Sequence, residues 1–140
     1  MKYYIPILLL LLCSCSKAES ADELTVNEAT WKKANIQAYE FTLRIGCFCP
    51  PETVGPHKIR VQADTIFSVN GIPYQRGVSN KLPTLAELFT FIRESDARNP
   101  YKKSVTYQTT FGFPDYIFYD FSEQIADEEI LYVVTDFKKN

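Results

Sequence analysis

The sequence predicts a single α+β domain: an antiparallel sheet of about six strands with two helices packed on one face, in the order α-β-β-β-α-β-β-β. Three observations support this fold class. Short segments of alternating polar and apolar residues follow one another through tight turns, as in antiparallel hairpins. Two other segments carry helix-capping motifs. The chain lacks the regular alternation of strands with crossover helices that builds a parallel sheet.

The first predicted helix begins at a capping box, in which Thr25 caps the backbone and Glu28 reaches back from three residues later. We expect this helix to run through Trp31 to about Ala38. Residues 39–45 then alternate strictly between apolar and polar side chains, which is the period of a strand with one buried face.

Two further strands are predicted: one at residues 58–63, where apolar and polar side chains again alternate, and a short one at residues 65–69. They form a hairpin that turns at residues 63–64. The second strand ends at an Asn70-Gly71 turn.

The second helix follows Pro83 and has its own capping box, formed by Thr84 and Glu87. The helical region closes at Asn99-Pro100. Its apolar residues fall at i, i+3, i+4 and i+7, so one stripe should pack on the sheet. This stripe consists of Leu85, Leu88, Phe89 and Ile92.

The last third of the chain is predicted to form three strands, at residues 104–110, 116–121 and 130–137. A Phe-Gly-Phe-Pro turn separates the first two, and an acidic loop precedes the third. Aromatic residues crowd this region, and core packing is favoured over an exposed binding patch. They are Phe111, Phe113, Tyr116, Phe118, Tyr119 and Phe121.

The N-terminus is typical of an export signal, because a basic Lys2 precedes an apolar run at residues 5–12 that is too short to span a membrane. The segment Leu12-Cys13-Ser14-Cys15 resembles a bacterial lipobox, which makes Cys15 the candidate for lipidation. A simple secreted chain or an unprocessed anchor is the alternative. We therefore interpret residues 1–14 as a lipoprotein signal peptide, 15–24 as the lipidated cysteine with a polar tether, and 25–140 as the domain.

The balance of charged residues excludes nucleic acid as a partner. Of the 140 residues, 15 are Lys or Arg and 17 are Asp or Glu, so the chain has no basic excess for nucleic acid. Removing residues 1–14 takes away Lys2, which leaves a mature charge of 14 − 17 = −3. Membrane attachment would rest on the lipid of Cys15, and the remaining partner would be an unknown protein or small molecule.

Cys47 and Cys49 are the two thiols left after signal removal and lipidation, and three interpretations compete for them. A local structural disulfide is favoured in an exported chain, since Gly46 and Pro50 allow the backbone to bend. A redox-active pair is the second interpretation. Copper(I) binding by the two thiolates is a weaker third, with the single histidine, His57, as an additional ligand.

Other chemistry is poorly supported by the sequence. It contains no Gly-x-Ser-x-Gly elbow, phosphate-binding glycine loop or His-Glu-x-x-His motif, so no catalytic residue, cofactor or metal site is expected. The cluster Asp127-Glu128-Glu129 lacks the ligand spacing of an EF-hand and is interpreted as a solvated turn.

Several motifs together resemble a family of bacterial lipoproteins known as domain of unknown function 6174. The most specific is Cys47-Phe48-Cys49-Pro50, and the resemblance spans residues 25–137. Ala63-Asp64-Thr65 departs from the family, which often has a glycine in this turn. Weaker motifs are Trp31, Tyr39, Val54-Gly55-Pro56, residues 84–89, residues 107–114 and Asp127-Glu128-Glu129.

This resemblance implies an exported, membrane-tethered α+β domain and brings no established activity. We therefore expect a non-enzymatic lipoprotein that presents a sheet face or loop surface to its ligand. It would be anchored to the bacterial cell membrane or outer membrane, at the periplasmic or cell-surface face. The alternative is a thiol-redox or copper(I)-handling protein that uses Cys47 and Cys49.

Overall fold

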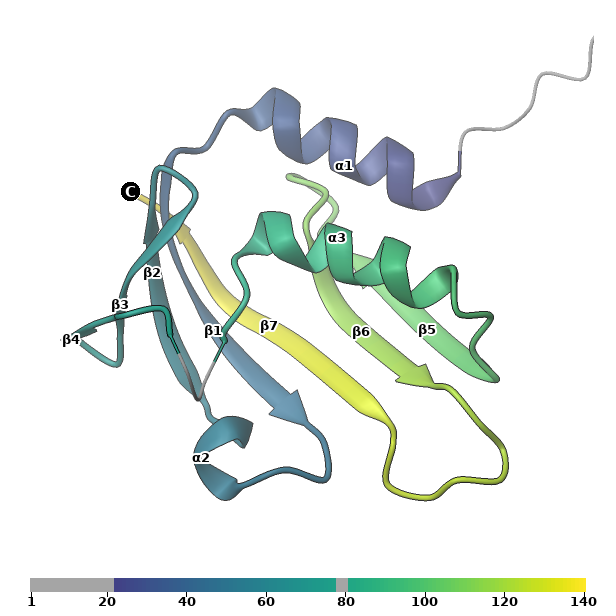
Figure 1. The fold of residues 1–140 in the computed structure, drawn as a ribbon. Coiled ribbons are helices and arrows are strands. Elements are labelled where there is room, and N and C mark those ends of the chain that lie inside the picture. The colour runs from purple at the N-terminus through teal and green to yellow at the C-terminus, as the bar shows by residue number, and fades with distance from the viewer. Residues whose placement is uncertain (1–21, 78–80) are drawn as a thin grey trace, which may run out of the picture.

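The protein is described by a computed structural model that covers residues 22–77 and 81–140. Within those residues, one seven-stranded antiparallel sheet carries two long helices on one face, and a single-turn helix lies at the end of the sheet (Figure 1). The elements in chain order are α1 (Glu23–Ala34), β1 (Ala38–Gly46), α2 (Pro51–Val54), β2 (His57–Gln62), β3 (Thr65–Val69), β4 (Ile72–Pro73), α3 (Leu85–Asp96), β5 (Lys102–Tyr107), β6 (Pro114–Asp120) and β7 (Ile130–Lys139).

The strand order across the sheet is β4-β3-β2-β1-β7-β6-β5, and every neighbouring pair is antiparallel. The strands β1 to β4 follow one another in space as they do in sequence, and β5 pairs with β6. The C-terminal strand β7 lies between these two groups. Its residue Tyr132 pairs with Ile45 of β1 on one side and with Ile117 of β6 on the other. The last strand of the chain therefore joins the two groups into one sheet.

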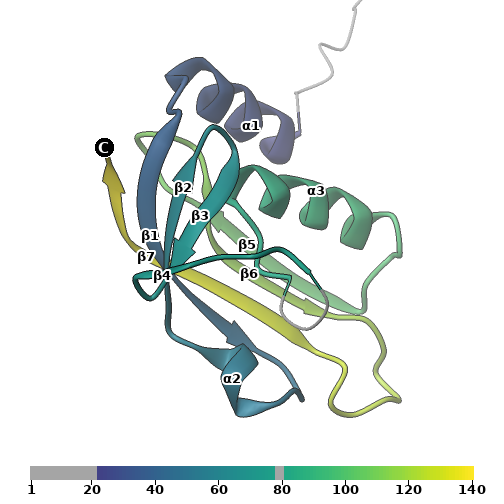
Figure 2. The same cartoon turned by 60° about the vertical axis from the view of Figure 1, so that its left-hand side comes forward.

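The core lies between the sheet and the helices α1 and α3 (Figure 2). Alternate residues of β1 face it, and the side chains of Tyr39, Phe41 and Leu43 have no exposed surface. Trp31 of α1 packs edge-on against Tyr39, with ring centres 5.4 Å apart. Burying a large apolar side chain stabilises a fold by about 1.5–3 kcal/mol, so this contact holds α1 over the sheet.

Helix α3 confirms its predicted capping box and apolar stripe. The Thr84 hydroxyl accepts a hydrogen bond from the backbone N–H of Glu87 at 3.2 Å, and the Glu87 carboxylate accepts one from the N–H of Thr84 at 2.9 Å. The stripe faces the sheet, as its spacing predicts. Its four residues, Leu85, Leu88, Phe89 and Ile92, are all buried.

The capping box predicted at Thr25 is wrong. Asp22 caps α1 instead: its carboxylate accepts hydrogen bonds from the N–H of Leu24 at 2.8 Å and from the Thr25 hydroxyl at 3.0 Å. Glu28 turns away from the cap to pair with cationic side chains. The helix also ends earlier than predicted, at Ala34, because the next residue, Asn35, has the left-handed conformation that stops a helix.

The predicted number of elements needs correction, although the antiparallel α+β class is confirmed. The described residues form seven strands instead of about six, and three helices instead of two. The additional elements are α2, with four residues, and β4, with two, which are too short for any periodicity to show. In the last third, the strands predicted at 104–110, 116–121 and 130–137 instead have the bounds given for β5, β6 and β7.

Strand alternation divides the aromatic run between two environments. Tyr119 is buried under α3 and Phe113 is buried in the turn that precedes β6, as core packing predicts. Phe113 lies against Phe137, with ring centres 4.6 Å apart. Tyr116 alternates with the buried Ile117 and is 37% exposed, so it lies on the helix-free face of the sheet. The core prediction therefore holds for part of this run.

Candidate functional site

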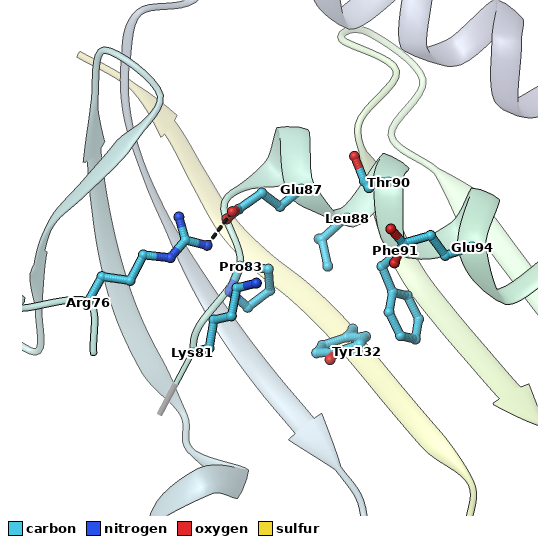
Figure 3. A pocket seen from close by; sticks show the side chains of 9 residues that line it. All are labelled: Arg76, Lys81, Pro83, Glu87, Leu88, Thr90, Phe91, Glu94 and Tyr132. Atoms are coloured by element: carbon cyan, nitrogen blue, oxygen red, sulfur yellow. Dashed lines mark hydrogen bonds and ion pairs between the residues drawn. The ribbon is translucent and has the colours of Figure 1, made fainter. Parts of the chain in front are cut away.

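A pocket lies between α3, β7 and the chain that leads into α3 (Figure 3). Its volume is about 420 Å³. Pockets that bind small molecules usually measure about 300–1,000 Å³, so this one is large enough for a small ligand. It is lined by Arg76, Lys81, Pro83, Glu87, Leu88, Thr90, Phe91, Glu94 and Tyr132.

The helical period of α3 places one wall of this pocket. Thr90, Phe91 and Glu94 lie three, four and seven residues after Glu87, so the four form a second stripe beside the buried one. Tyr132 of β7 faces this stripe, and its ring packs edge-on against Phe91 with centres 5.0 Å apart. The helix and the strand therefore supply a firm apolar wall.

The polar groups of the pocket are distributed around its rim. Arg76 forms an ion pair with Glu87, and the same carboxylate also caps α3. Burial alone would raise the pKa of Glu87, but the hydrogen bonds from Thr84 and Arg76 and the nearby guanidinium outweigh it and lower that pKa. Burial raises the pKa of Tyr132. Glu87 is therefore anionic and Tyr132 neutral at physiological pH.

Two rim charges have no ion pair among the residues that the structure describes. They are the ammonium group of Lys81 and the carboxylate of Glu94, both on exposed residues. Figure 3 shows them on opposite sides of the pocket, with Leu88, Phe91 and Tyr132 between them. The pocket thus offers a cation, an apolar wall and an anion in sequence.

The cysteine motif lies at the opposite end of β1 from the Ala38 terminus. Cys47 and Cys49 form a disulfide in the structure, with their Cα atoms 5.3 Å apart. Phe48, between them, is 83% exposed. Cys47 and Phe48 also line a second hollow of about 280 Å³ together with Asp127, Glu129, Gly46 and Leu131. Two motifs far apart in the sequence, Cys-Phe-Cys and the acidic loop, therefore share one surface.

His57 has a structural contact of its own. It is 7% exposed on β2, and its Nε2 lies 2.9 Å from the backbone oxygen of Thr53 in α2, within hydrogen-bond distance. Within residues 22–77 and 81–140, no three His, Cys, Asp or Glu side chains gather as a metal site. The predicted lipidation site, Cys15, and the predicted signal peptide lie outside the described residues. No helix of the described part is long and apolar enough to cross a membrane.

Comparison with known proteins identifies the family. The sequence model of the "Family of unknown function (DUF6174)" matches residues 23–139. The chain belongs to this family. The DUF6174 match thus confirms the family resemblance found in the sequence. No curated protein and no solved structure matches the chain.

The pocket of this DUF6174 domain was not found from the sequence. Lys81 and Tyr132 lie 51 positions apart (132 − 81), and only the insertion of β7 beside β1 brings the strand under α3. One signal was present: residues 87, 90, 91 and 94 have helical spacing next to the apolar stripe, which marks a second face of α3. That face carries two acids, Glu87 and Glu94, and the aromatic ring of Phe91, and such a combination of polar and apolar groups is typical of a ligand pocket.

Proposed function

We propose that this DUF6174 chain is an exported lipoprotein, anchored to a bacterial cell membrane or outer membrane through Cys15, whose domain binds a ligand and catalyses no reaction. The lipobox-like sequence before Cys15 supports the anchor. The absence of a catalytic motif in the full sequence supports a binding role. The pocket under α3 is the proposed binding site.

The ligand class follows from the arrangement of Lys81 and Glu94. Two uncommitted charges of opposite sign on either side of an apolar wall match a short zwitterion that carries an apolar side chain. An amino acid or dipeptide has this chemistry: its carboxylate would pair with Lys81, and its ammonium with Glu94. This single observation carries the proposal, because hydrogen bonds to charged groups are the strong and orienting contacts of such a site.

Calorimetry with three related probes tests this ligand class. The probes are the dipeptide leucyl-phenylalanine, its N-acetyl form and its C-terminal amide, titrated into the purified mature chain. We expect the free dipeptide to bind, and each blocked form to bind about 10- to 150-fold more weakly, since a charge-assisted hydrogen bond contributes about 1.5–3 kcal/mol. Binding should also shift NMR signals of the residues that line the pocket.

Two variants test which residue of the pocket binds each end of the ligand. Lys81→Met should abolish the preference for the free carboxylate over the amide, and Glu94→Gln should abolish the preference for the free amine over the acetyl form. Lys33→Met removes an exposed cation of α1 and should change neither preference. If no probe binds, or if Lys33→Met and Lys81→Met have the same effect, the zwitterion site is wrong.

The lipid anchor has its own test. In a bacterial host, the Cys15→Ala variant should move from the membrane fraction to the soluble extracytoplasmic fraction and should no longer incorporate a labelled fatty acid. Cys13→Ala, two residues earlier, should remain in the membrane fraction. Equal membrane association of both variants would contradict anchoring through Cys15.

The pairing of Cys47 with Cys49 is compatible with a second candidate function, which is thiol-redox exchange, or copper(I) handling by the two thiolates once the bond is reduced. A redox protein should exchange this disulfide with glutathione within minutes, and a copper protein should retain one copper(I) ion per reduced chain. Intact mass measured with and without alkylation distinguishes these outcomes from an inert bond. A bond that resists mild reductants would leave the pair with a purely structural role.

A further inference from the structure

Phe48 lies in a small disulfide-closed loop, and its side chain points into solvent. It is 83% exposed, more than any other large hydrophobic side chain among the described residues. The disulfide between its two neighbours, Cys47 and Cys49, closes a three-residue ring, which restricts the backbone on both sides of Phe48. A backbone held in this way loses little conformational entropy on binding, which helps to preorganise Phe48 as a contact residue.

The hollow beside Phe48 is lined by acidic residues. Residues 46–56 contain one acid and residues 121–129 contain four, and neither segment contains Lys or Arg. Asp127 and Glu129 line the hollow beside Phe48, where Leu131 forms an apolar side. This hollow therefore has room for a basic side chain, whose apolar stem would pack on Leu131 while its charge faces the carboxylates.

Phe48, Asp127 and Glu129 mark one end of the molecule, which we call the acidic end. In both views, α1 lies at one end, while the connection from β1 to α2 and the loop from β6 to β7 lie at the other (Figures 1 and 2). The described chain begins at the α1 end. Under the proposed anchoring through Cys15, Phe48 therefore lies at the end of the domain farther from the attachment, and the carboxylates beside it would be repelled by anionic lipid.

We infer that the surface formed by Phe48, Asp127, Glu129 and Leu131 docks a protein partner that has an apolar socket bordered by Lys or Arg. Phe48 enters the socket, and a basic side chain of the partner enters the acidic hollow. Aromatic residues in buried sockets commonly dominate the energy of an interface, and complementary charge selects the partner. This surface shares no lining residue with the pocket under α3, so it stands or falls separately from the proposed ligand.

Photo-crosslinking in the native cell tests the inference with the full-length protein. p-Benzoylphenylalanine replaces Phe48, and cross-linked protein is identified by mass spectrometry. We expect one major protein adduct, attached at an apolar site that is bordered by basic residues in the partner. The adduct should decrease at least 10-fold when Asp127→Lys and Glu129→Lys are added. With the purified partner, Phe48→Ser should weaken binding about 30-fold, as expected for a dominant contact.

Matched controls keep the result specific. Phe67, 60% exposed on β3, provides the same replacement elsewhere on the surface, and Phe67→Ser should leave partner binding unchanged. Circular dichroism should show both serine variants folded. Three results would overturn the inference: no protein adduct at position 48, an adduct that charge reversal does not reduce, or Phe48-dependent binding to vesicles of phosphatidylcholine and phosphatidylglycerol.

Discussion

Thr84 and Asp22 cap the two long helices by different means. Thr84 shares a reciprocal pair of hydrogen bonds with Glu87, whereas Asp22 accepts hydrogen bonds from the N–H of Leu24 and the Thr25 hydroxyl. We expect Thr84→Ala and Asp22→Ala each to lower the free energy of unfolding by about 1 kcal/mol, the usual effect of removing a cap. Urea unfolding monitored by circular dichroism measures this loss.

Thr25→Ala is the informative control for this prediction. Its spacing to Glu28 satisfies the capping-box pattern, but its hydroxyl only donates to the Asp22 carboxylate. We expect a loss of less than about 0.5 kcal/mol, as for most surface substitutions. A loss at Thr25 equal to that at Asp22 would contradict the observed cap.

Glu28 connects the two long helices to each other and titrates in the acid range. Its carboxylate lies 2.8 Å from the Lys32 ammonium and 2.5 Å from the Arg93 guanidinium of α3. The hydrogen bond from Lys32 lowers the pKa of Glu28; partial burial opposes this shift, and the charges of Arg93 and Lys32 reinforce it. The ion pair therefore stabilises the folded state at pH values above 4.5, the ordinary pKa of a glutamate. This stabilisation is lost as the pH falls through the lowered pKa of Glu28.

We therefore expect Glu28→Gln to reduce the free energy of unfolding at pH 7 by up to about 1 kcal/mol, and to have less effect at pH 3. Urea midpoints at both values measure the difference. Glu52→Gln makes the same change at an exposed side chain of α2 with no ion pair among the described residues, and should not alter the midpoint at pH 7. A Glu28→Gln effect that is equal at both pH values would exclude this electrostatic origin.

At the scale of elements, the turn between β5 and β6 approaches α1 through Gly112. Gly112 has a φ of 76°, and a Cβ placed there would lie 2.5 Å from the backbone oxygen of Asn27. Gly71 has a similar φ of 80° but open space around it. We expect Gly71→Ala to cost about 1 kcal/mol from backbone strain alone, and Gly112→Ala about 3 kcal/mol, because overpacking adds to the strain.

Thermal unfolding of the two variants makes this comparison direct, since both replace a glycine of positive φ with the same residue. The difference between them reports the contact of the turn with α1. Equal losses would show that this turn does not pack on the helix.

The extent of sequence-based prediction also differs from element to element. Helix α3 could be predicted because its cap and its apolar stripe are both local patterns. For helix α1 the spacing of Thr25 and Glu28 predicted the wrong cap, because the Glu28 carboxylate pairs with Arg93, which is 65 residues away in the sequence. The pocket and the acidic end depend on where β7 lies in the sheet, and local patterns carry no information about strand order.

At the scale of the whole molecule, the core is closed by tyrosines that must remain neutral. Burial raises the pKa of Tyr107 to about 12 and also raises the pKa values of Tyr39, Tyr119 and Tyr132. The Tyr119 hydroxyl also donates to the Asp96 carboxylate at 2.9 Å, and this contact reinforces the shift. Above pH 10 the unfolded chain therefore releases protons that the folded chain retains, and unfolding becomes more favourable as the pH rises.

We expect the urea midpoint to fall progressively from pH 9 to pH 12, with phenolate absorbance at 295 nm developing later in the folded chain than in chain unfolded by urea. Tyr119→Phe should cost about 1 kcal/mol at pH 8, because it removes a hydrogen bond, but should flatten the alkaline decline. Tyr116→Phe on the helix-free face should leave the midpoint at pH 8 unchanged. If phenolate absorbance rose at the same pH in folded and in unfolded chain, folding would not raise the pKa values of these tyrosines. Their ionisation could then not explain the loss of stability at alkaline pH.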